Sequence, residues 1–587
     1  MYIIGINAFH GDSSACILKD GTLIAAAEEE RFCRIKHYAG FPSEAIKWCL
    51  LHAKINLEDV DIIAINQDFK ANMLRKIIFT ITKKPNLKML YDRFQNKRKR
   101  LGIKEYLLKS FPNSKFNGSV RSVEHHTAHL SSAFHVSPFE KAVTVSVDGF
   151  GDFASSAWGV GKKNKIELHD RIYFPHSLGI FYQALTQFIG FKNYGDEYKV
   201  MGLAPYGKPV FLNQMREIVK LKSDGKFELN LDYFRHHKEK FEYKWNDGTP
   251  QVGTLFSNKL EELLGPARLK NTELTQHFMD IAHSVQAMYE EAFFNLLNNL
   301  YHKYNIEDLA ISGGCGMNSV ANGKILLKTP FKKIYVQAAP GDAGGAIGAA
   351  FATWHNVAEE KVKEKIIFHD HAYWGPSFNN QYIENLLKKQ KNIIKNQSYV
   401  IKNIADNFEL TKITASHIAD GKVVGWFQGR MEWGPRALGN RSIVCDPRRD
   451  NMKDIINLKI KRRESFRPFA PSILSESVSE WFEQSQSVPF MMQVYQVKKE
   501  KRNIIPAVTH VDGSGRLQTV YESTNPKYHN LISEFNKLTN VPIILNTSFN
   551  ENEPIVCKPE EALETFLRTK MDLLVMENWI IERNQKI

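Results

Sequence analysis

The chain has 587 residues, of which 43% are hydrophobic and 11% aromatic. This apolar content is enough for large cores and excludes a mostly disordered chain, and the length corresponds to roughly four domain-sized units. The 78 lysines and arginines outnumber the 64 aspartates and glutamates, and the net charge of +14 favours anionic ligands without separating nucleic acids from phosphorylated small molecules.

Cysteine spacing and hydropathy argue against several further classes of protein. The six cysteines form no Cys-x-x-Cys pair, so the sequence predicts neither a disulfide framework nor a zinc ribbon. The first residues lack the charged segment and cleavage site of a signal peptide, and no stretch approaches the ~18 apolar residues that a membrane span needs. We therefore expect a cytoplasmic protein with reduced thiols and no membrane partner.

The N-terminal region alternates short apolar runs with turn residues. Strands are predicted at residues 2–6, 15–18 and 23–27, separated by polar turns. A similar unit recurs at residues 142–158, where an apolar strand ends in Asp-Gly and a glycine-rich turn leads to a second strand. Tight turns of this kind can direct backbone N–H groups at a phosphate, so two copies predict a duplicated nucleotide-binding domain.

The rest of the chain contains a basic stretch, a long helix and a domain boundary. Residues 83–100 are strongly basic, which indicates a solvated helical surface or, as the alternative, an RNA-contacting arm. Apolar residues at three- and four-residue spacing predict a core-facing helix over 273–300. The polar segment from residue 356 to about 400 is the predicted boundary. Beyond it we predict strands at 423–427, 541–545 and 573–576, with a helix at 559–568.

A histidine pair is the first candidate for chemistry. His125 and His129 are four residues apart, so on a helix they share one face. Two imidazoles supply half of a metal site, and Asp148 and Asp342 are the candidate carboxylates that would complete it with Fe, Mn or Zn. The alternative is that these histidines cap a helix or bind a substrate phosphate.

A glycine-rich segment, ISGGCGMN, follows a predicted strand and opens a helix. Glycines at such a place let the backbone approach a ligand, and a helix N-terminus favours phosphate. The segment matches neither the P-loop pattern nor a clean Gly-x-Gly-x-x-Gly. The sequence therefore argues against a P-loop protein and against a Rossmann-type dinucleotide-binding protein. Tight turns made only for packing remain the alternative.

The last third of the chain places cations beside glycine, proline and aromatic residues. Arg436 stands in WGPRALGN and Arg467 in SFRPF, with Lys461 and Arg516 nearby in the sequence. Arginines at such turns are typical of guanidinium groups held for bidentate contact with phosphate or carboxylate. A surface-charge explanation suits Arg448 and Arg449 better than it suits Arg436 or Arg467.

Taken together, these blocks resemble the NodU/CmcH-type O-carbamoyltransferase family. The matching segments run in order over nearly the whole chain and include FHGDSSACIL, HHTAHLSSAF, VDGFGD, ISGGCGMNSVAN, PGDAGGAIGAA, WGPRALGNRSI, KRRESFRPFAP and LNTSFNENEPIV. The resemblance implies an α/β chain. Its first domain (1–355) would be a duplicated Kae1-like domain of the actin/sugar-kinase/Hsp70 type, followed by a linker and domain start (356–400) and a YrdC-like α/β domain (401–587).

The resemblance also implies a two-step reaction. Carbamoyl phosphate and ATP, the latter with Mg, would give carbamoyl-adenylate in the second domain, and the first domain would pass the carbamoyl group to a hydroxyl of a small molecule or sugar. Its implied nucleotide and phosphate ligands are Lys36, Gly313, Gly314, Asn318, Arg436, Lys461, Arg467, Arg516, Asn546 and Ser548. His10 would be the general base, and iron is the metal implied for His125, His129, Asp148 and Asp342.

Two other functions fit parts of this sequence. A tRNA-modifying threonylcarbamoyl transferase shares these domain types and fits the basic charge, but WGPRALGNRSI matches the carbamoyltransferases better. A non-catalytic protein of the same fold would have damaged ligand sets, whereas every candidate residue is present. We therefore expect no nucleic-acid partner; a homodimer is left open, and so are the acceptor and the roles of residues 83–100 and 212–271.

Overall fold

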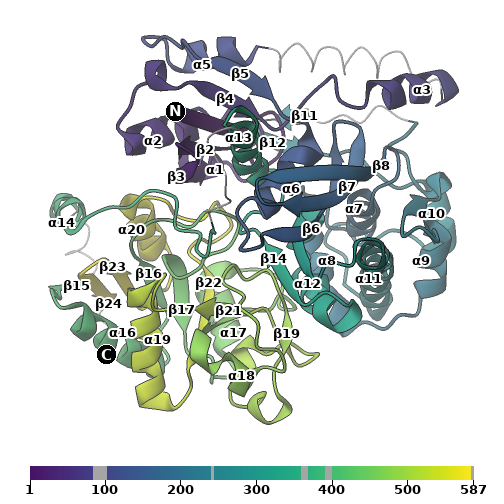
Figure 1. The fold of residues 1–587 in the computed structure, drawn as a ribbon. Coiled ribbons are helices and arrows are strands. Elements are labelled where there is room, and N and C mark those ends of the chain that lie inside the picture. Colours follow the sequence, from purple (N-terminus) through teal and green to yellow (C-terminus); the bar gives the residue numbers. More distant parts are fainter. Residues whose placement is uncertain (84–101, 239–243, 247, 359–367, 391–398, 584–587) are drawn as a thin grey trace. The chain divides into compact units, whose positions relative to one another are not determined.

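A computed structural model describes residues 1–83, 102–238, 244–246, 248–358, 368–390 and 399–583 (Figure 1). The chain forms two compact units, Met1–His369 and Asp370–Ile587. The predicted basic segment lies almost entirely outside the described residues. Among the helices of the described ranges, none combines the length and the apolar character that crossing a bilayer requires.

The first unit contains two five-stranded sheets built in the same order. In the first sheet the central strand pairs antiparallel with the strand that follows it and parallel with the fourth. Its spatial order is β3-β2-β1-β4-β5, with β1 (Tyr2–Asn7), β2 (Ser14–Lys19), β3 (Thr22–Glu28), β4 (Ile62–Ile65) and β5 (Ser119–Ser122). All three strands predicted at the N-terminus are therefore confirmed.

The second sheet repeats this topology. Its central strand again pairs antiparallel with the next strand and parallel with the fourth. The spatial order is β8-β7-β6-β13-β14, with β6 (Lys141–Gly151), β7 (Ala154–Lys162), β8 (Lys165–Tyr173), β13 (Asp308–Ser312) and β14 (Lys333–Val336). The duplication predicted from the two hairpins is thus confirmed.

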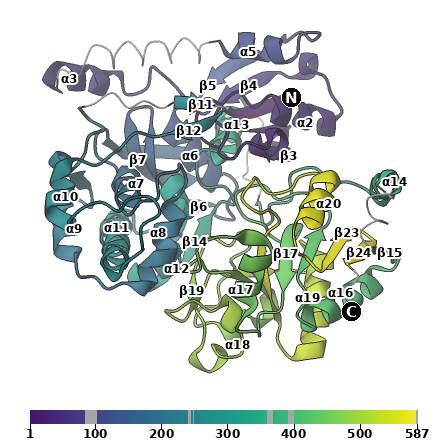
Figure 2. The ribbon, with the colours of Figure 1, turned by 180° about the vertical axis from the view of Figure 1, so that it is seen from behind.

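Two central helices lie between the sheets (Figures 1 and 2). α13 (Gly344–Val357) packs on β1, β2 and β4 of the first sheet, and α6 (His125–Phe134) packs on β6, β7 and β13 of the second. The two helices also pack closely on each other, because Gly348 has no Cβ to collide with the carbonyl oxygen of Ala128.

Outer helices complete the layers of the first unit. α2 (Ser43–Ala53) covers the first sheet, while α7 (Leu178–Phe188) and α11 (Gln276–Tyr304) cover the second, and α11 confirms the predicted long helix. The remaining elements of this unit are α1 (Glu30–Cys33), α3 (Met73–Lys83), α5 (Ile103–Ser110), α8 (Glu197–Leu203), α9 (Leu212–Ile218), α10 (Asn258–Leu264), α12 (Ser319–Lys328), β9 (Val219–Leu221), β10 (Phe227–Leu229), β11 (Lys244–Asn246) and β12 (Thr249–Gln251).

The second unit is built on one mixed eight-stranded sheet of order β15-β24-β23-β16-β17-β22-β18-β21. Its strands are β15 (Tyr399–Asn403), β16 (Val424–Phe427), β17 (Arg441–Cys445), β18 (Ala470–Leu474), β21 (Gln518–Val520), β22 (Ile543–Ser548), β23 (Leu573–Met576) and β24 (Trp579–Arg583). The helices are α14 (Asn380–Lys389), α16 (Asn407–Ala419), α17 (Met452–Ile456), α18 (Val478–Trp481), α19 (Pro526–Thr539) and α20 (Pro559–Arg568). A short strand pair, β19 (Tyr495–Gln496) with β20 (Ser514–Gly515), lies apart from the sheet. The three predicted strands and the predicted helix are confirmed.

Candidate functional site

The helix that carries the histidine pair is fixed at its first turn. The Glu124 carboxylate caps α6 by accepting hydrogen bonds from the backbone N–H and the hydroxyl of Thr127, both at 2.8 Å. The Asp152 carboxylate accepts a further bond from the backbone N–H of His125 at 2.9 Å. Because this turn is held from two sides, His125 and His129 project in one direction from a single helix face.

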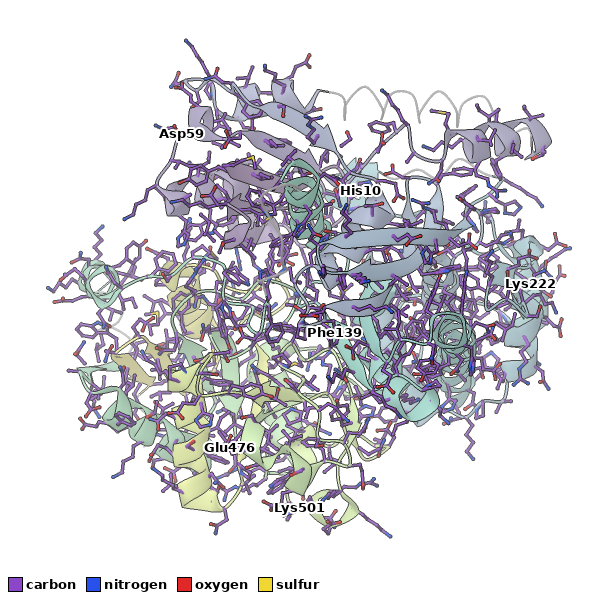
Figure 3. All side chains as sticks on the ribbon, viewed as in Figure 1. His10, Asp59, Phe139, Lys222, Glu476 and Lys501 are labelled. Atoms are coloured by element: carbon purple, nitrogen blue, oxygen red, sulfur yellow. The ribbon has the colours of Figure 1, made fainter. Side chains whose placement is uncertain are left out.

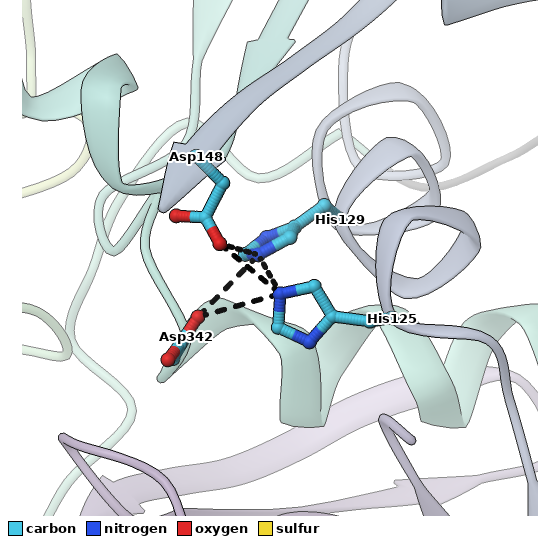
Figure 4. Close-up of side chains that lie close together, drawn as sticks. All are labelled: His125, His129, Asp148 and Asp342. Atoms are coloured by element: carbon cyan, nitrogen blue, oxygen red, sulfur yellow. Dashed lines mark hydrogen bonds and ion pairs between the residues drawn. The ribbon is translucent and has the colours of Figure 1, made fainter. Parts of the chain in front are cut away.

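Four side chains meet in front of this helix face (Figure 4). The Nε2 atoms of His125 and His129 are 3.0 Å apart. Asp148, near the end of β6, places Oδ2 3.2 Å from Nε2 of His125 and 3.7 Å from Nε2 of His129. Asp342, just before α13, places Oδ1 3.6 Å and 3.5 Å from the same two nitrogen atoms. The structure therefore brings together all four residues proposed as metal ligands.

The two carboxylates of this cluster favour a positive charge beside them, either on a histidine or on a bound cation. Burial favours neutral His125, but Asp148 and Asp342 outweigh it and raise its pKa to about 9. Although burial alone would raise the pKa of Asp148, hydrogen bonds and charges from His125 and His129 hold it well below its usual range. The pKa of Asp342 is also lowered, against burial and the neighbouring Asp148, by His10, His129 and His125. Two ionised carboxylates thus face the same small volume.

The donor set fits a divalent transition metal. One atom from each of the four side chains lies within 4.8 Å of the others, and both histidines are fully buried. Mixed imidazole and carboxylate ligation suits Fe, Mn or Zn, and the two negative charges would balance those of the cation. The residues present are therefore suitable for the implied cation.

The candidate base lies beside this cluster. His10 follows β1 in the turn toward β2, and its Nδ1 is 3.7 Å from Oδ2 of Asp342. Its ring stacks on that of His125 with centroids 5.7 Å apart. Figure 3 shows His10 inside the first unit, whereas Asp59 and Lys222 lie at its edge. His10 and the candidate cation ligands therefore share one site.

The predicted glycine loop contacts the same site. Gly313 has φ +86°, and a Cβ there would collide with the carbonyl oxygen of Val147. The backbone N–H of Gly314 donates to Oδ1 of Asp148 at 2.7 Å. Asn318 caps α12 by accepting from the N–H of Ala321 at 3.1 Å. The loop thus holds Asp148 in place, and α12 begins directly after the loop.

Lys36 is the first-unit candidate that the structure does not draw into this cluster. Its side chain is exposed, and its carbonyl oxygen accepts a bond from the hydroxyl of Thr249 at 3.3 Å. The neighbouring His37 places Nδ1 2.7 Å from Oδ1 of Asp12, and its backbone N–H donates to Glu30. Lys36 therefore lies at the rim of a second polar group formed by Asp12, Glu30 and His37.

The second unit gathers four guanidinium groups. Arg436 lies between β16 and β17, Arg463 and Arg467 precede β18, and Arg516 precedes β21. Burial and the charges of Arg436, Arg463 and Arg467 hold the pKa of Arg516 well below its usual range. Positive charges so close repel one another in a buried place, so the group is suited to a ligand carrying several negative charges.

A buried carboxylate and a buried guanidinium shape the loop that carries Arg436. Oε1 of Glu432 accepts from the backbone N–H groups of Leu438, Asn440 and Arg441 at 2.7, 2.8 and 3.0 Å. The fully buried guanidinium of Arg441 donates to the carbonyl oxygens of Gln428, Gly429, Asn440 and Pro376 and lies 3.7 Å from the ring centroid of Phe427. The loop is therefore preorganised by the protein itself.

The other candidates of the second unit belong to two hydrogen-bonded groups. Nζ of Lys461 donates to the carbonyl oxygens of Ser548 and Asn550, at 2.6 and 2.7 Å, and to Oδ1 of Asn550 at 2.8 Å. Asn546, on β22, donates to Ser472, to Gln518 and to the carbonyl oxygen of Ala437, next to Arg436. Lys461 thus fixes the turn after β22. Asn546 holds the loop that carries Arg436 through its bond to Ala437.

Several residues of the two sites are not among the site residues predicted from the sequence. Asp152 ends the VDGFGD block and Glu124 precedes the histidine pair, so both stand next to residues that were singled out. Arg463, which packs 4.3 Å over the ring of Phe469, stands in the basic run KRR, where spacing alone does not separate it from its neighbours. Glu432 and Arg441 act through backbone groups, for which the sequence gives no signal.

Two family models match most of this chain. The family model described as Carbamoyltransferase N-terminus matches residues 2–351, and the one described as Carbamoyltransferase C-terminus matches residues 415–583. A Synechocystis protein, "Uncharacterized protein sll1178", is 40% identical over 99% of this chain and 97% of its own length. Nodulation protein NolNO of Sinorhizobium fredii is 36% identical over 98% of this chain and 80% of its own length.

Solved structures match more distantly. HypF from T. kodakarensis has a TM-score of 0.31 at 11% identity, with 62% of this chain and 49% of that chain covered. Component A of the (R)-2-hydroxyglutaryl-CoA dehydratase of Acidaminococcus fermentans has a TM-score of 0.32 at 14% identity, with 61% and 99% covered. With family models matching most of its length and a 40% identical relative matching it nearly end to end, the chain belongs to the carbamoyltransferase family of enzymes.

Proposed function

We propose that this carbamoyltransferase is ATP-dependent and transfers a carbamoyl group to a hydroxyl of a small molecule or sugar through carbamoyl-adenylate. In the second unit, water would cleave carbamoyl phosphate to carbamate and phosphate. The carbamate oxygen would then attack the α-phosphorus of ATP, and pyrophosphate would leave. Carbamoyl-adenylate, pyrophosphate and phosphate account for all atoms of the two substrates and the water.

The arginine group of the second unit is the observation that carries this proposal. ATP and carbamoyl phosphate together bring several negative charges, which must approach one another within bonding distance. The charges of Arg436, Arg463 and Arg467 already act against the charge of Arg516. Binding such anions relieves that repulsion, and fixed donors cost little reorganisation during the reaction.

The first unit supports the transfer step. His10 would take the proton from the acceptor hydroxyl, whose oxygen would attack the carbamoyl carbon while AMP leaves. Asp342, whose Oδ2 lies 3.7 Å from Nδ1 of His10, would help to orient the imidazole. When bound by His125, His129, Asp148 and Asp342, a divalent cation such as iron would supply Lewis acidity toward the phosphate of the adenylate.

Adenylate formation is tested by pyrophosphate release from ATP. The purified chain should release pyrophosphate only when carbamoyl phosphate is also present. Arg436→Ala should lower the rate by about 10²-fold or more, because it removes a donor aimed at the phosphates. Arg448→Ala is the matched control, since Arg448 pairs with Asp446 instead, at 2.8 Å, and it should stay within about twofold. No pyrophosphate from the unmodified chain would refute the proposal.

The transfer step is tested separately. His10→Asn should leave pyrophosphate release intact and abolish the carbamate mass increase on a panel of hydroxylated sugars and metabolites. If both steps fell equally, His10 would not be the base. If His10→Asn transferred the carbamoyl group at an unchanged rate, His10 would also not be the base.

A further inference from the structure

Helix α3 (Met73–Lys83) is anchored to the first unit by one face. Phe79 is buried, and its ring packs edge-on against those of Phe153 and Phe174 at centroid distances of 5.7 and 5.0 Å. The guanidinium of Arg75 lies 4.8 Å from the ring centroid of Tyr173. These contacts fix the rotation of the helix about its own axis, so its other side must face away from the unit.

That other side is apolar and exposed. At ~3.6 residues per turn, five large side chains form one stripe opposite Phe79. They are Met73, Leu74, Ile77, Ile78 and Ile81, with exposures of 44, 70, 49, 43 and 67%. Figures 1 and 2 show α3 at the outer end of the first unit in both views. A contiguous stripe of this kind is typical of an interaction surface rather than of scattered surface residues.

Charge decides which partner this stripe fits. The helix contains Arg75, Lys76 and Lys83 and no acidic residue. A second copy of the chain would bring like charges together, whereas an apolar stripe on a helix with only basic charges is complementary to an anionic lipid surface.

We propose that α3 docks on the surface of bilayers that contain anionic phospholipids, with its apolar stripe at the boundary between headgroups and acyl chains. The chain would then bind peripherally, which needs no membrane-spanning helix. This inference replaces the sequence-based expectation of no membrane partner. It rests on α3 alone and is independent of the proposed carbamoyl transfer.

The test is co-sedimentation of the full chain with vesicles. We expect binding to phosphatidylcholine vesicles containing phosphatidylglycerol, weaker binding to phosphatidylcholine alone, and a loss of binding as salt increases. Ile77→Ser with Ile81→Ser should lower the partition coefficient by at least about tenfold, because two apolar side chains leave the interface. Leu269→Ser with Leu327→Ser, at positions 69 and 63% exposed elsewhere in the first unit, is the matched control and should bind like the unmodified chain.

Three outcomes would overturn the inference. The first is equal binding by both double variants, and the second is no binding of the unmodified chain to anionic vesicles. The third is a dimer in light scattering that becomes a monomer in Ile77→Ser with Ile81→Ser while neither protein binds vesicles, which would assign the stripe to a second copy. Circular dichroism and thermal unfolding of the variants establish that they are folded.

Discussion

Replacing one buried carboxylate should loosen the arginine loop of the second unit. Glu432 accepts three backbone hydrogen bonds from Leu438, Asn440 and Arg441. A bond to a charged acceptor stabilises a protein by about 1.5–3 kcal/mol, against about 0.5–1.5 kcal/mol for a neutral one. Glu432→Gln keeps an acceptor oxygen but removes the charge, so it should cost about 1 kcal/mol per bond, or about 3 kcal/mol in all.

Thermal unfolding of the full chain measures this cost. For a unit of about 200 residues, 3 kcal/mol corresponds to a fall in Tm of roughly 6–12 °C in the transition of the second unit. Because the loop carries Arg436, pyrophosphate release should also fall, by at least about tenfold, at a temperature where the variant is folded. Glu480→Gln is the control, since Glu480 is 63% exposed and pairs with Lys501 at the surface; it should shift the free energy of unfolding by less than about 0.5 kcal/mol. A fall of less than about 2 °C for Glu432→Gln would refute the reasoning.

Three further predictions concern the first unit. Burial raises the pKa of Glu29 to about 7, above its unfolded value, so its contribution of up to about 3 kcal/mol is complete below pH 4.5 and is lost as the pH rises to 7. Burial raises the pKa values of Glu28 and Glu197 in the same way. Urea unfolding at pH 5 and 7.5 should therefore show a loss of stability in the unmodified chain that is smaller, by up to about 3 kcal/mol, in Glu29→Gln, and an equal loss in both would contradict this. Gly313→Ala should destabilise the unit by at least about 2 kcal/mol, because φ is +86° and a Cβ would meet the Val147 carbonyl; an unchanged Tm would contradict this. Asp148→Asn should lower the affinity for Fe²⁺, Mn²⁺ or Zn²⁺ by at least about tenfold in equilibrium dialysis, with Asp170→Asn, on an exposed edge of β8, unchanged; equal affinities would remove Asp148 from the ligand set.

Local patterns in the sequence were sufficient for much of the fold. The alternation around residues 2–27 and 142–158 predicted both hairpins because each strand is specified by neighbours a few residues away. The pairing of β15 with β24, by contrast, joins Tyr399 to Arg583. Strand pairs of such separation depend on the whole packed unit, and no local spacing encodes them.

The candidate site divides in the same way. His125 and His129 share a helix face, so their spacing alone predicted half of the cation ligands. Asp152 holds the same helix turn through a backbone N–H, and side-chain spacing carries no information on such a bond. Lys461 was expected at the phosphates, and the structure shows its ammonium group donating to the turn at Ser548 and Asn550, a contact set by tertiary packing.

The exchange of helices between the two duplicated halves has a consequence for dissecting the protein. α6 follows the first sheet in the chain but covers the second, and α13 follows the second sheet but covers the first. A fragment ending near residue 140 would lack α13, so one face of the first sheet would be exposed to solvent. It would keep α6 but lack the second sheet on which α6 packs. Neither half should be expressible as a well-behaved fragment, and activity should return only when both are produced together and assemble.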